Sequence, residues 1–358
     1  MIEDEIKRQT RGQFLRACRR EPVDRTPIWI MRQAGRYLAE YRAIRARHSF
    51  LEMCKTPELA CEITVQPVDV LGVDAAILFA DILLPLEPAG LVIEFSEEQG
   101  PTILNPVRST ADVNALRIIE PDDCGYVLEA VRLVRKELAG RVPLIGFAGA
   151  PFTLASYVVE GGSTRLYRQC KTLMYNHPTV WHALMDKLAD VVITYLNGQI
   201  EAGAQAVQVF DSWAGNLSPQ DYREYVLPHS AKVFANLDHR VPHIHFAHQA
   251  GTMLELVKEA GGDVIGLDWR VEIDSAIRRL GDGVAVQGNL DPMVLFARPD
   301  VIREKVRHIL ARVGSRPGHI FNLGHGIHKD TPVEHVKELV RCVHDISGEL
   351  HAKHSGDL

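Results

Sequence analysis

The sequence predicts an α/β fold, a (β/α)8 TIM barrel formed by one domain over residues 1–358. Short apolar runs alternate with long amphipathic stretches from one end of the chain to the other, which is typical of strands alternating with helices. Eight strand-then-helix units can be counted, and this number favours a closed barrel over a doubly wound open sheet. Neither a linker-like composition nor a low-complexity tract divides the chain.

The predicted strands are mostly rich in Val, Ile, Leu and Phe, as expected for a parallel sheet that helices cover. They are residues 27–32, 75–81, 143–148, 206–212, 243–247, 264–268, 284–288 and 319–323. Apolar residues at helical spacing predict helices between them. The clearest are residues 126–138, 180–202, 222–237, 300–313 and 332–346.

Three segments add to this simple alternation. Residues 1–20 have the pattern of an amphipathic N-terminal helix that leads into the barrel, and residues 33–74 are expected to hold two helices. After the second strand, an apolar run at 91–95, a polar stretch at 96–100 and a second run at 101–104 predict an inserted β-hairpin.

Composition narrows the classes of function. A net charge of −6 gives no general attraction to nucleic acid or to an anionic membrane. No uncharged apolar run approaches the roughly 18 residues of a membrane span, and the N-terminus lacks the apolar segment of a secretory signal. The six cysteines include no Cys-x-x-Cys pair, which argues against a disulfide framework and a cysteine-rich zinc site. We therefore expect a cytoplasmic protein with reduced thiols.

Two arginines follow the first predicted strand. Arg32 and Arg36 lie four residues apart with Gly35 between them. Each guanidinium offers a planar fork of donors that matches a carboxylate or a phosphate. The pair can also be the start of a helix with two solvated arginines.

The ends of the other predicted strands are also polar, and the carboxyl ends of barrel strands are where active sites form. The residues there include Asp81, Asp211, Ser212, Asp268, Arg270, Asn289 and His325. The two later aspartates can instead cap a helix or pair with an arginine inside the barrel. The glycines on either side of His325 are unusual around a core histidine and indicate a ligand contact. These residues suggest a small carboxylate-bearing ligand but do not define a reaction.

A metal site is the alternative that His243, His245 and His248 raise. The first two share a face of one strand and could converge on an ion. The sequence offers no further ligand of matching character, so polar packing at the barrel rim is the favoured interpretation, and no metal is predicted.

Two long motifs resemble the signatures of the uroporphyrinogen decarboxylase family. They are Met-Arg-Gln-Ala-Gly-Arg-Tyr at residues 31–37 and Gly-Phe-Ala-Gly-Ala-Pro-Phe-Thr-Leu at 146–154. The likeness continues, in order over nearly the whole chain, at residues 79–83, 157–162, 287–292 and 322–326.

The resemblance implies a (β/α)8 barrel and a carboxy-lyase of porphyrin and haem biosynthesis. Such an enzyme removes carbon dioxide from the four acetate side chains of uroporphyrinogen III and gives coproporphyrinogen III. The resemblance also implies a cytoplasmic homodimer that uses no cofactor.

The resemblance implies roles for individual residues as well. Arg32 and Arg36 would hold substrate carboxylates, and Asp81 would accept hydrogen bonds from the pyrrole N–H groups. The catalytic group would be Asp81, Arg32 and Tyr157, with Arg32 suggested as the proton donor. The remaining substrate contacts would be Gln33, Ala34, Gly35, Phe50, Tyr157, Ser212 and His325.

The implied chemistry accounts for an acid in a site for a polyanion. Loss of carbon dioxide leaves an electron pair, and a pyrrole ring protonated at carbon can accept it without a cofactor. A fixed carboxylate at Asp81 would stabilise that cationic ring. In two places the chain departs from the family pattern, since Lys329 stands where a proline is expected and Trp213 where some members have histidine.

Two other functions compete with this one. Related barrels are zinc- and corrinoid-linked methyltransferases that use a His-x-Cys pair, where this chain has His243 and His245. A non-catalytic tetrapyrrole carrier is the other alternative, and the joint presence of Arg32, Asp81 and Tyr157 argues against it.

Overall fold

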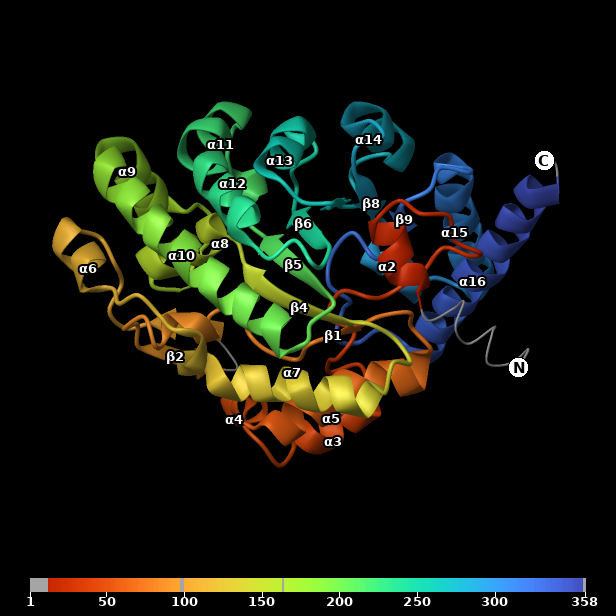
Figure 1. The fold of residues 1–358 in the computed structure, drawn as a ribbon, viewed down its shortest axis with the longest axis horizontal. Helices are drawn as coiled ribbons and strands as arrows, with labels where there is room; N and C mark the ends of the chain where they lie inside the picture. The colour runs from red at the N-terminus through yellow and green to blue at the C-terminus, as the bar shows by residue number, and fades with distance from the viewer. Residues whose placement is uncertain (1–11, 97–99, 163, 357–358) are drawn as a thin grey trace.

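A parallel sheet curls at the centre of the molecule and helices form an arc around its outside (Figure 1). The computed structural model describes residues 12–96, 100–162 and 164–356, the last four as backbone only. The sheet has seven strands in the order β1-β4-β5-β6-β7-β8-β9, and all neighbours are parallel. This arrangement confirms the predicted α/β barrel class.

Each strand of the sheet falls within a predicted range or within one residue of it. The strands are β1 (Ala76–Ile77), β4 (Leu144–Gly149), β5 (Ala206–Asp211), β6 (His243–Ala247), β7 (Val264–Gly266), β8 (Ala285–Gln287) and β9 (His319–Ile320). The predicted hairpin is confirmed as β2 (Ile93–Ser96) and β3 (Gly100–Ile103), which pair antiparallel.

The outer helices follow the strands along the chain. They include α6 (Thr110–Ala115), α7 (Gly125–Leu138), α8 (Pro151–Glu160), α9 (Arg168–Asn176), α10 (Pro178–Ala202), α13 (Leu254–Ala260), α14 (Ile273–Leu280), α15 (Pro299–Val313) and α16 (Val333–Gly356). Short 3-10 helices are η1 (Leu84–Leu86), η2 (Pro121–Cys124), η3 (Ala214–Asn216) and η4 (Pro292–Phe296). Of the predicted N-terminal helix, residues 1–11 lie outside the described part, and α2 (Gln13–Cys18) forms the rest.

Two helix predictions need correction. Residues 33–74 hold three helices, namely α3 (Ala39–Arg45), α4 (Phe50–Lys55) and α5 (Pro57–Leu71). Ser49 caps α4 in a capping box, and the proline at the start of α5 separates it from α4. Residues 222–237 form no single helix either, because α11 (Pro219–Tyr225) ends before Val226 and α12 (Leu227–Asn236) has Pro228 in its first turn.

The predicted first strand is present in position but not as a strand. The amide of Phe321 donates to the carbonyl of Pro27 at 2.8 Å, which joins this segment to the chain following β9. On its other side, the amide of Asp74 donates to the carbonyl of Ile28 at 2.8 Å. The segment therefore closes the barrel between β9 and β1, although only one bridge, Ile28 with Phe321, is regular.

Side chains explain why no ladder forms there. Three amides of the segment donate to side-chain oxygens rather than to strand carbonyls. The pairs are Ile28 N to Asp74 Oδ2 at 2.8 Å, Ile30 N to Gln33 Oε1 at 3.0 Å, and Met31 N to Asn322 Oδ1 at 3.0 Å. The backbone is satisfied but leaves the regular pairing pattern.

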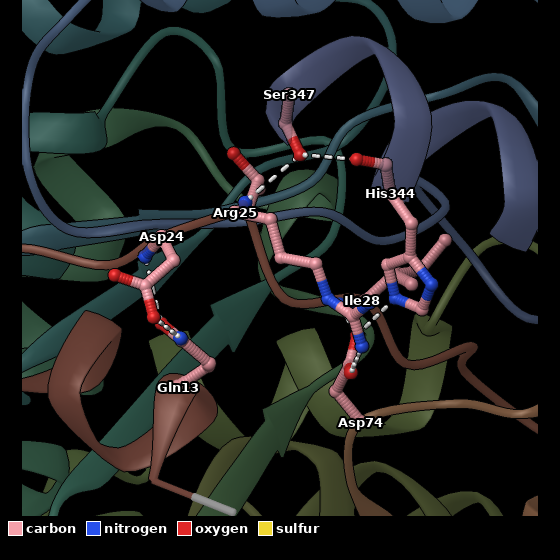
Figure 2. Close-up of polar contacts among 8 residues, drawn as sticks. Gln13, Asp24, Arg25, Ile28, Asp74, His344 and Ser347 are labelled. Carbon is pink, nitrogen blue, oxygen red and sulfur yellow. Dashed lines mark hydrogen bonds and ion pairs between the residues drawn. The ribbon is translucent and has the colours of Figure 1, made fainter. Parts of the chain in front are cut away.

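Asp74 ties this closure to the C-terminal helix (Figure 2). Its Oδ2 accepts from the amide of Ile28 and, at 2.6 Å, from Nε2 of His344 on α16. Its Oδ1 accepts from Nη2 of Arg25 at 3.2 Å. One nearly buried carboxylate thus connects the closing segment, the start of β1 and α16.

Inside the barrel, a chain of polar side chains lies below the carboxyl end of the strands. Trp29 Nε1 donates to Gln287 Oε1 at 2.8 Å, and Gln287 Nε2 donates to Gln208 Oε1 at 2.9 Å. Around it the buried apolar side chains form one continuous cluster. In the described part of the chain, no helix combines the length and apolar character needed to cross a membrane.

Candidate active site

The second predicted strand, observed as β1, ends early, and Asp81 lies on the segment that follows it. After Leu78, the amide of Phe79 donates to Thr64 Oγ1 at 2.9 Å instead of to β4. The backbone of Phe147 on β4 is held by the side-chain amide of Gln199, at 3.0 Å and 3.1 Å. The predicted strand at 75–81 is therefore shorter than expected, and its last residues no longer pair with β4.

Asp81 is a half-buried carboxylate at this end. Its Oδ1 accepts from the amide of Leu83 at 2.8 Å. Burial raises the pKa of Asp81 to about 6, against the opposing effects of the Leu83 amide and the charge of Arg32. At pH 7 the carboxyl group is thus mostly ionised, because this pH is about one unit above its pKa.

Arg32 is aimed by an unusual turn. The amide of Gln33 donates to the carbonyl of Ile30 at 2.8 Å, and Arg32 inside that turn has φ +64°. This left-handed conformation is uncommon and strained for a residue other than glycine. Its exposed side chain passes over Gly326, where an added Cβ would lie 2.4 Å from Arg32 Cδ. Glycine at 326 makes room for the arginine.

His325 is half-buried next to Arg32. A Cβ at Gly324 would lie 2.3 Å from the backbone nitrogen of Trp269, so the first flanking glycine is needed for close packing. Burial lowers the pKa of His325 to about 4, with smaller contributions from Arg32, His248 and Arg270. The imidazole is therefore neutral at pH 7 when the site holds no anion.

Tyr157 and Ser212 come from neighbouring units. Tyr157 on α8 is half-buried, with its ring 6.2 Å from that of Trp213, and burial together with the Asp81 charge raises its pKa. Ser212 directly follows β5, and its amide donates to Thr153 Oγ1 at 2.9 Å. The charge of Arg32 acts on Asp81, Tyr157 and His325, and that of Asp81 acts on Tyr157, so Arg32 is the residue that these three share as a neighbour.

The stretch from Gln33 to Arg36 is divided between core and surface. The side chain of Gln33 is fully buried. Its Oε1 accepts from the backbone amide of Ile30 and its Nε2 donates to the carbonyl of Ala75, so this side chain stabilises the barrel closure. Ala34 and Gly35 are half-buried, and Arg36 is exposed. Only the backbone of Gln33 can therefore line the same wall as its neighbours.

Phe50 belongs to an aromatic group beside Asp81. Its ring lies 5.9 Å from Phe79, two residues before the carboxylate, and 5.4 Å from Phe95 of the hairpin. Tyr41 contacts the same Phe79 at 5.8 Å, and the charge of Arg36 acts on Tyr41. Phe50 is thus connected to the site through Phe79.

Other polar residues at strand ends point elsewhere. Asp211 is fully buried, and its Oδ1 accepts from Thr153 Oγ1 of α8 at 3.3 Å; burial raises its pKa to about 7. His243 Nε2 pairs with the carbonyl of Asp238 at 3.1 Å, and His245 Nδ1 with that of Val257 at 3.2 Å. Among the described residues, no group of three or more His, Cys, Asp or Glu side chains could hold a metal ion.

The sequence marks Arg270 only as a polar residue at a strand end and His248 only as a possible metal ligand, and it assigns no role to Trp213 or Trp269. All four lie beside the site. A signal was available for two of them. Trp269 and Arg270 directly follow the strand that ends near Leu267, in the position where barrel loops begin.

Comparison with known proteins gives a family. The model described as "Uroporphyrinogen decarboxylase (URO-D)" matches residues 9–346. The chain is 63% identical over 336 residues to the uroporphyrinogen decarboxylase of Carboxydothermus hydrogenoformans, covering 93% of this chain and 96% of that one. It is 57% identical over 338 residues to that of Trichlorobacter lovleyi, covering 94% and 99%.

Among solved structures, a methyltransferase from Methanosarcina mazei superposes with a TM-score of 0.81. The match covers 94% of this chain and 98% of that one at 19% identity. At this identity the likeness supports the fold alone.

Proposed function

The chain belongs to the uroporphyrinogen decarboxylase family, and we propose that the site at its barrel mouth converts uroporphyrinogen III to coproporphyrinogen III. The enzyme is a carboxy-lyase of porphyrin and haem biosynthesis. The observation that carries the residue assignment is the grouping of the Asp81 carboxylate with Arg32, Tyr157 and His325 at one end of the barrel.

The substrate explains the mixture of charges. Uroporphyrinogen has eight carboxylates at its edge and four pyrrole N–H groups at its centre. Arg32 and Arg36 are exposed guanidinium groups that suit the carboxylates, while Asp81 suits the N–H groups. His325 and Ser212 would contact further carboxylates, and Phe50 and the backbone of residues 33–35 would complete the wall.

The reaction can be written with this chain's own residues. A proton adds to the ring α-carbon next to the carbon that bears the acetate arm, which makes the ring cationic and lets the arm-bearing carbon accept an electron pair. The bond between the arm's CH2 and its carboxylate then breaks, carbon dioxide leaves, and the electron pair neutralises the ring. A second proton adds to the resulting exocyclic CH2 while the ring carbon returns the first, which leaves a methyl group. The net change consumes one proton for each carbon dioxide released.

Asp81 would stabilise the cationic ring, because a fixed anion in a partly desolvated site acts more strongly than in water. Arg32 would orient the departing carboxylate. A guanidinium gives up a proton only with great difficulty, so the role of proton donor is the less favoured one for this residue. The hydroxyl of Tyr157 lies within the influence of the Asp81 and Arg32 charges and would hold a carboxylate or the departing arm.

We propose in addition that the whole chain acts as one domain, in a cytoplasmic homodimer that needs no cofactor. The single family match over residues 9–346 supports the first point, and the protonated pyrrole as electron acceptor supports the last. Sedimentation velocity of the purified protein tests the dimer directly.

Anaerobic incubation with uroporphyrinogen III tests the proposal. With EDTA-treated enzyme and no added cofactor, mass analysis of the oxidised products should show stepwise loss of four carboxyl groups. Recovery of the intact eight-carboxylate macrocycle from a tight complex would favour the carrier instead. Stoichiometric zinc, together with activity that EDTA abolishes, would favour the methyltransferase.

A further inference from the structure

A cluster of side chains outside the assigned site lies at the same end of the barrel. This rim cluster consists of His248, Trp269 and Arg270, which follow β6 and β7, and it meets His325, which follows β9. The rings of His248 and His325 are 4.6 Å apart, and the ring of Trp269 lies 5.8 Å from His248. Three loops that are distant in sequence therefore converge beside Arg32.

Arg270 is held in place but keeps an open face. Its guanidinium carbon lies 3.9 Å above the ring of Trp269, a cation–π arrangement that fixes the side chain. Its Nη1 is 3.6 Å from Asp268 Oδ1, which is longer than a hydrogen bond, and the Arg270 side chain remains 45% exposed. A planar guanidinium that is already stacked loses little freedom when it takes up an anion.

His248 connects Arg270 to the assigned site. Arg270 Nη1 lies 3.4 Å from His248 Nε2, and because a guanidinium only donates, Nε2 must accept. The ring proton is then on Nδ1, and the backbone of Ser212 is close enough to act on the ring. His248 thus places the arginine relative to Ser212 and His325.

We propose that Arg270 is a further substrate-binding residue, which takes one side-chain carboxylate of the macrocycle at the edge formed by His325 and Ser212. The inference rests on the proposed function, because it assumes a ligand with several carboxylates around its rim. Such a ligand needs more cationic contacts than Arg32 and Arg36 provide, and Arg270 lies next to a proposed carboxylate contact. His248 is a positioning residue in this arrangement.

The test compares Arg270→Gln and Arg270→Lys with the wild type and with Arg132→Gln. Arg132 is a matched control, since its side chain is 56% exposed on α7 and pairs with Glu129 at 3.1 Å. For Arg270→Gln we expect KM for uroporphyrinogen III to rise about five- to tenfold, with kcat within about twofold and an unchanged melting temperature. Arg270→Lys should restore part of the affinity, and Arg132→Gln should match the wild type.

Substrate binding measured separately by equilibrium dialysis keeps the two proposals distinguishable. A wild type that binds but does not decarboxylate would overturn the proposed function, while the Kd of the variants would still report on Arg270. Unchanged KM and Kd in Arg270→Gln would overturn the inference. A fall in kcat accompanied by a lower melting temperature would also overturn it, because it would make Arg270 a structural residue.

Discussion

At the scale of single residues, the balance of effects on Asp81 is the most informative feature of the site. A neighbouring arginine and a backbone amide both favour the ionised form, yet burial is the larger effect and raises the pKa to about 6. The carboxylate is therefore a poorly solvated anion in the free protein. A cation that forms above it replaces the missing hydration, which is the condition for strong stabilisation of a charged intermediate.

This balance predicts the pH dependence. Asp81 must be ionised to stabilise the cationic ring, so kcat/KM should fall about tenfold per pH unit as the pH drops below about 6. His325, with its pKa lowered to about 4, stays neutral through most of that range and should not cause this acid limb of the pH profile. Initial rates across this range, measured anaerobically, provide the check.

Asp211→Asn is the control for this profile. Its carboxyl also has a raised pKa, to about 7, but it is fully buried and accepts a hydrogen bond from Thr153. The acid limb should persist in that variant. Loss of the acid limb in Asp211→Asn would assign the titration to Asp211 and contradict the role given to Asp81.

The sequence indicated the charged site residues because each one ends a strand or belongs to a long motif. The sequence could not indicate that the side chain of Gln33 is bonded within the barrel closure, since the partners of this side chain are backbone groups of Ile30 and Ala75. It also could not place Trp269 against Gly324, because that contact joins two loops more than fifty residues apart. Such facts depend on tertiary packing rather than on local pattern.

At the scale of elements, the closing segment 27–32 has two functions. It joins β9 to β1, and its last residue is Arg32, so the segment that completes the barrel also positions a proposed catalytic group. Its apolar pattern correctly predicted a segment between β9 and β1 but wrongly predicted a regular strand. The amides that would have built a ladder bind side chains of Asp74, Gln33 and Asn322, and two of these lie far away in the sequence.

Loss of the Asp74 contacts should destabilise this closure. In Asp74→Ala the amide of Ile28, His344 and Arg25 all lose an acceptor in a nearly buried position. We expect the free energy of unfolding to fall by about 3 kcal/mol in urea titrations. Asp69→Ala is the matched control: this carboxylate is 53% exposed and pairs with Arg141 at the surface, so its loss should change stability by less than about 1 kcal/mol. Equal effects of the two variants on the free energy of unfolding would contradict the stabilising role given to Asp74.

Helix breaks show where local pattern was sufficient and where it was not. The capping box at Ser49 and the proline at 57 were visible in the sequence and account for the third helix within 33–74. The prediction of two helices underweighted these stop and start signals. Pro228 likewise explains the division of 222–237, since it lacks the amide that a continuous helix would use.

At the scale of the whole molecule, charge is organised locally rather than globally. The net charge is −6, yet Arg32, Arg36 and Arg270 are exposed at or beside the barrel mouth. In the proposed function, these arginines would attract a polyanionic substrate locally although the net charge of the molecule is negative. Salt should weaken this local attraction, because exposed charges are screened within about 10 Å at ordinary ionic strength.

The half-buried carboxylate of Asp81 also opposes folding. Its pKa is raised in the folded state above the value of about 3.8 in an unfolded chain, so the free energy of unfolding decreases as pH rises through this interval. The penalty is essentially complete above about pH 7 and amounts to about 3 kcal/mol. The molecule retains this penalty at the position where the chemistry needs an anion.

The turnover of Asp81→Asn, measured together with its melting temperature at a pH above 7, tests this account most directly. Asparagine keeps the acceptor for the Leu83 amide but removes the charge. Single-turnover decarboxylation should slow by a factor of about 10² to 10³, while the melting temperature rises because the desolvated anion is gone. Turnover at the wild-type rate in a folded variant would contradict the account.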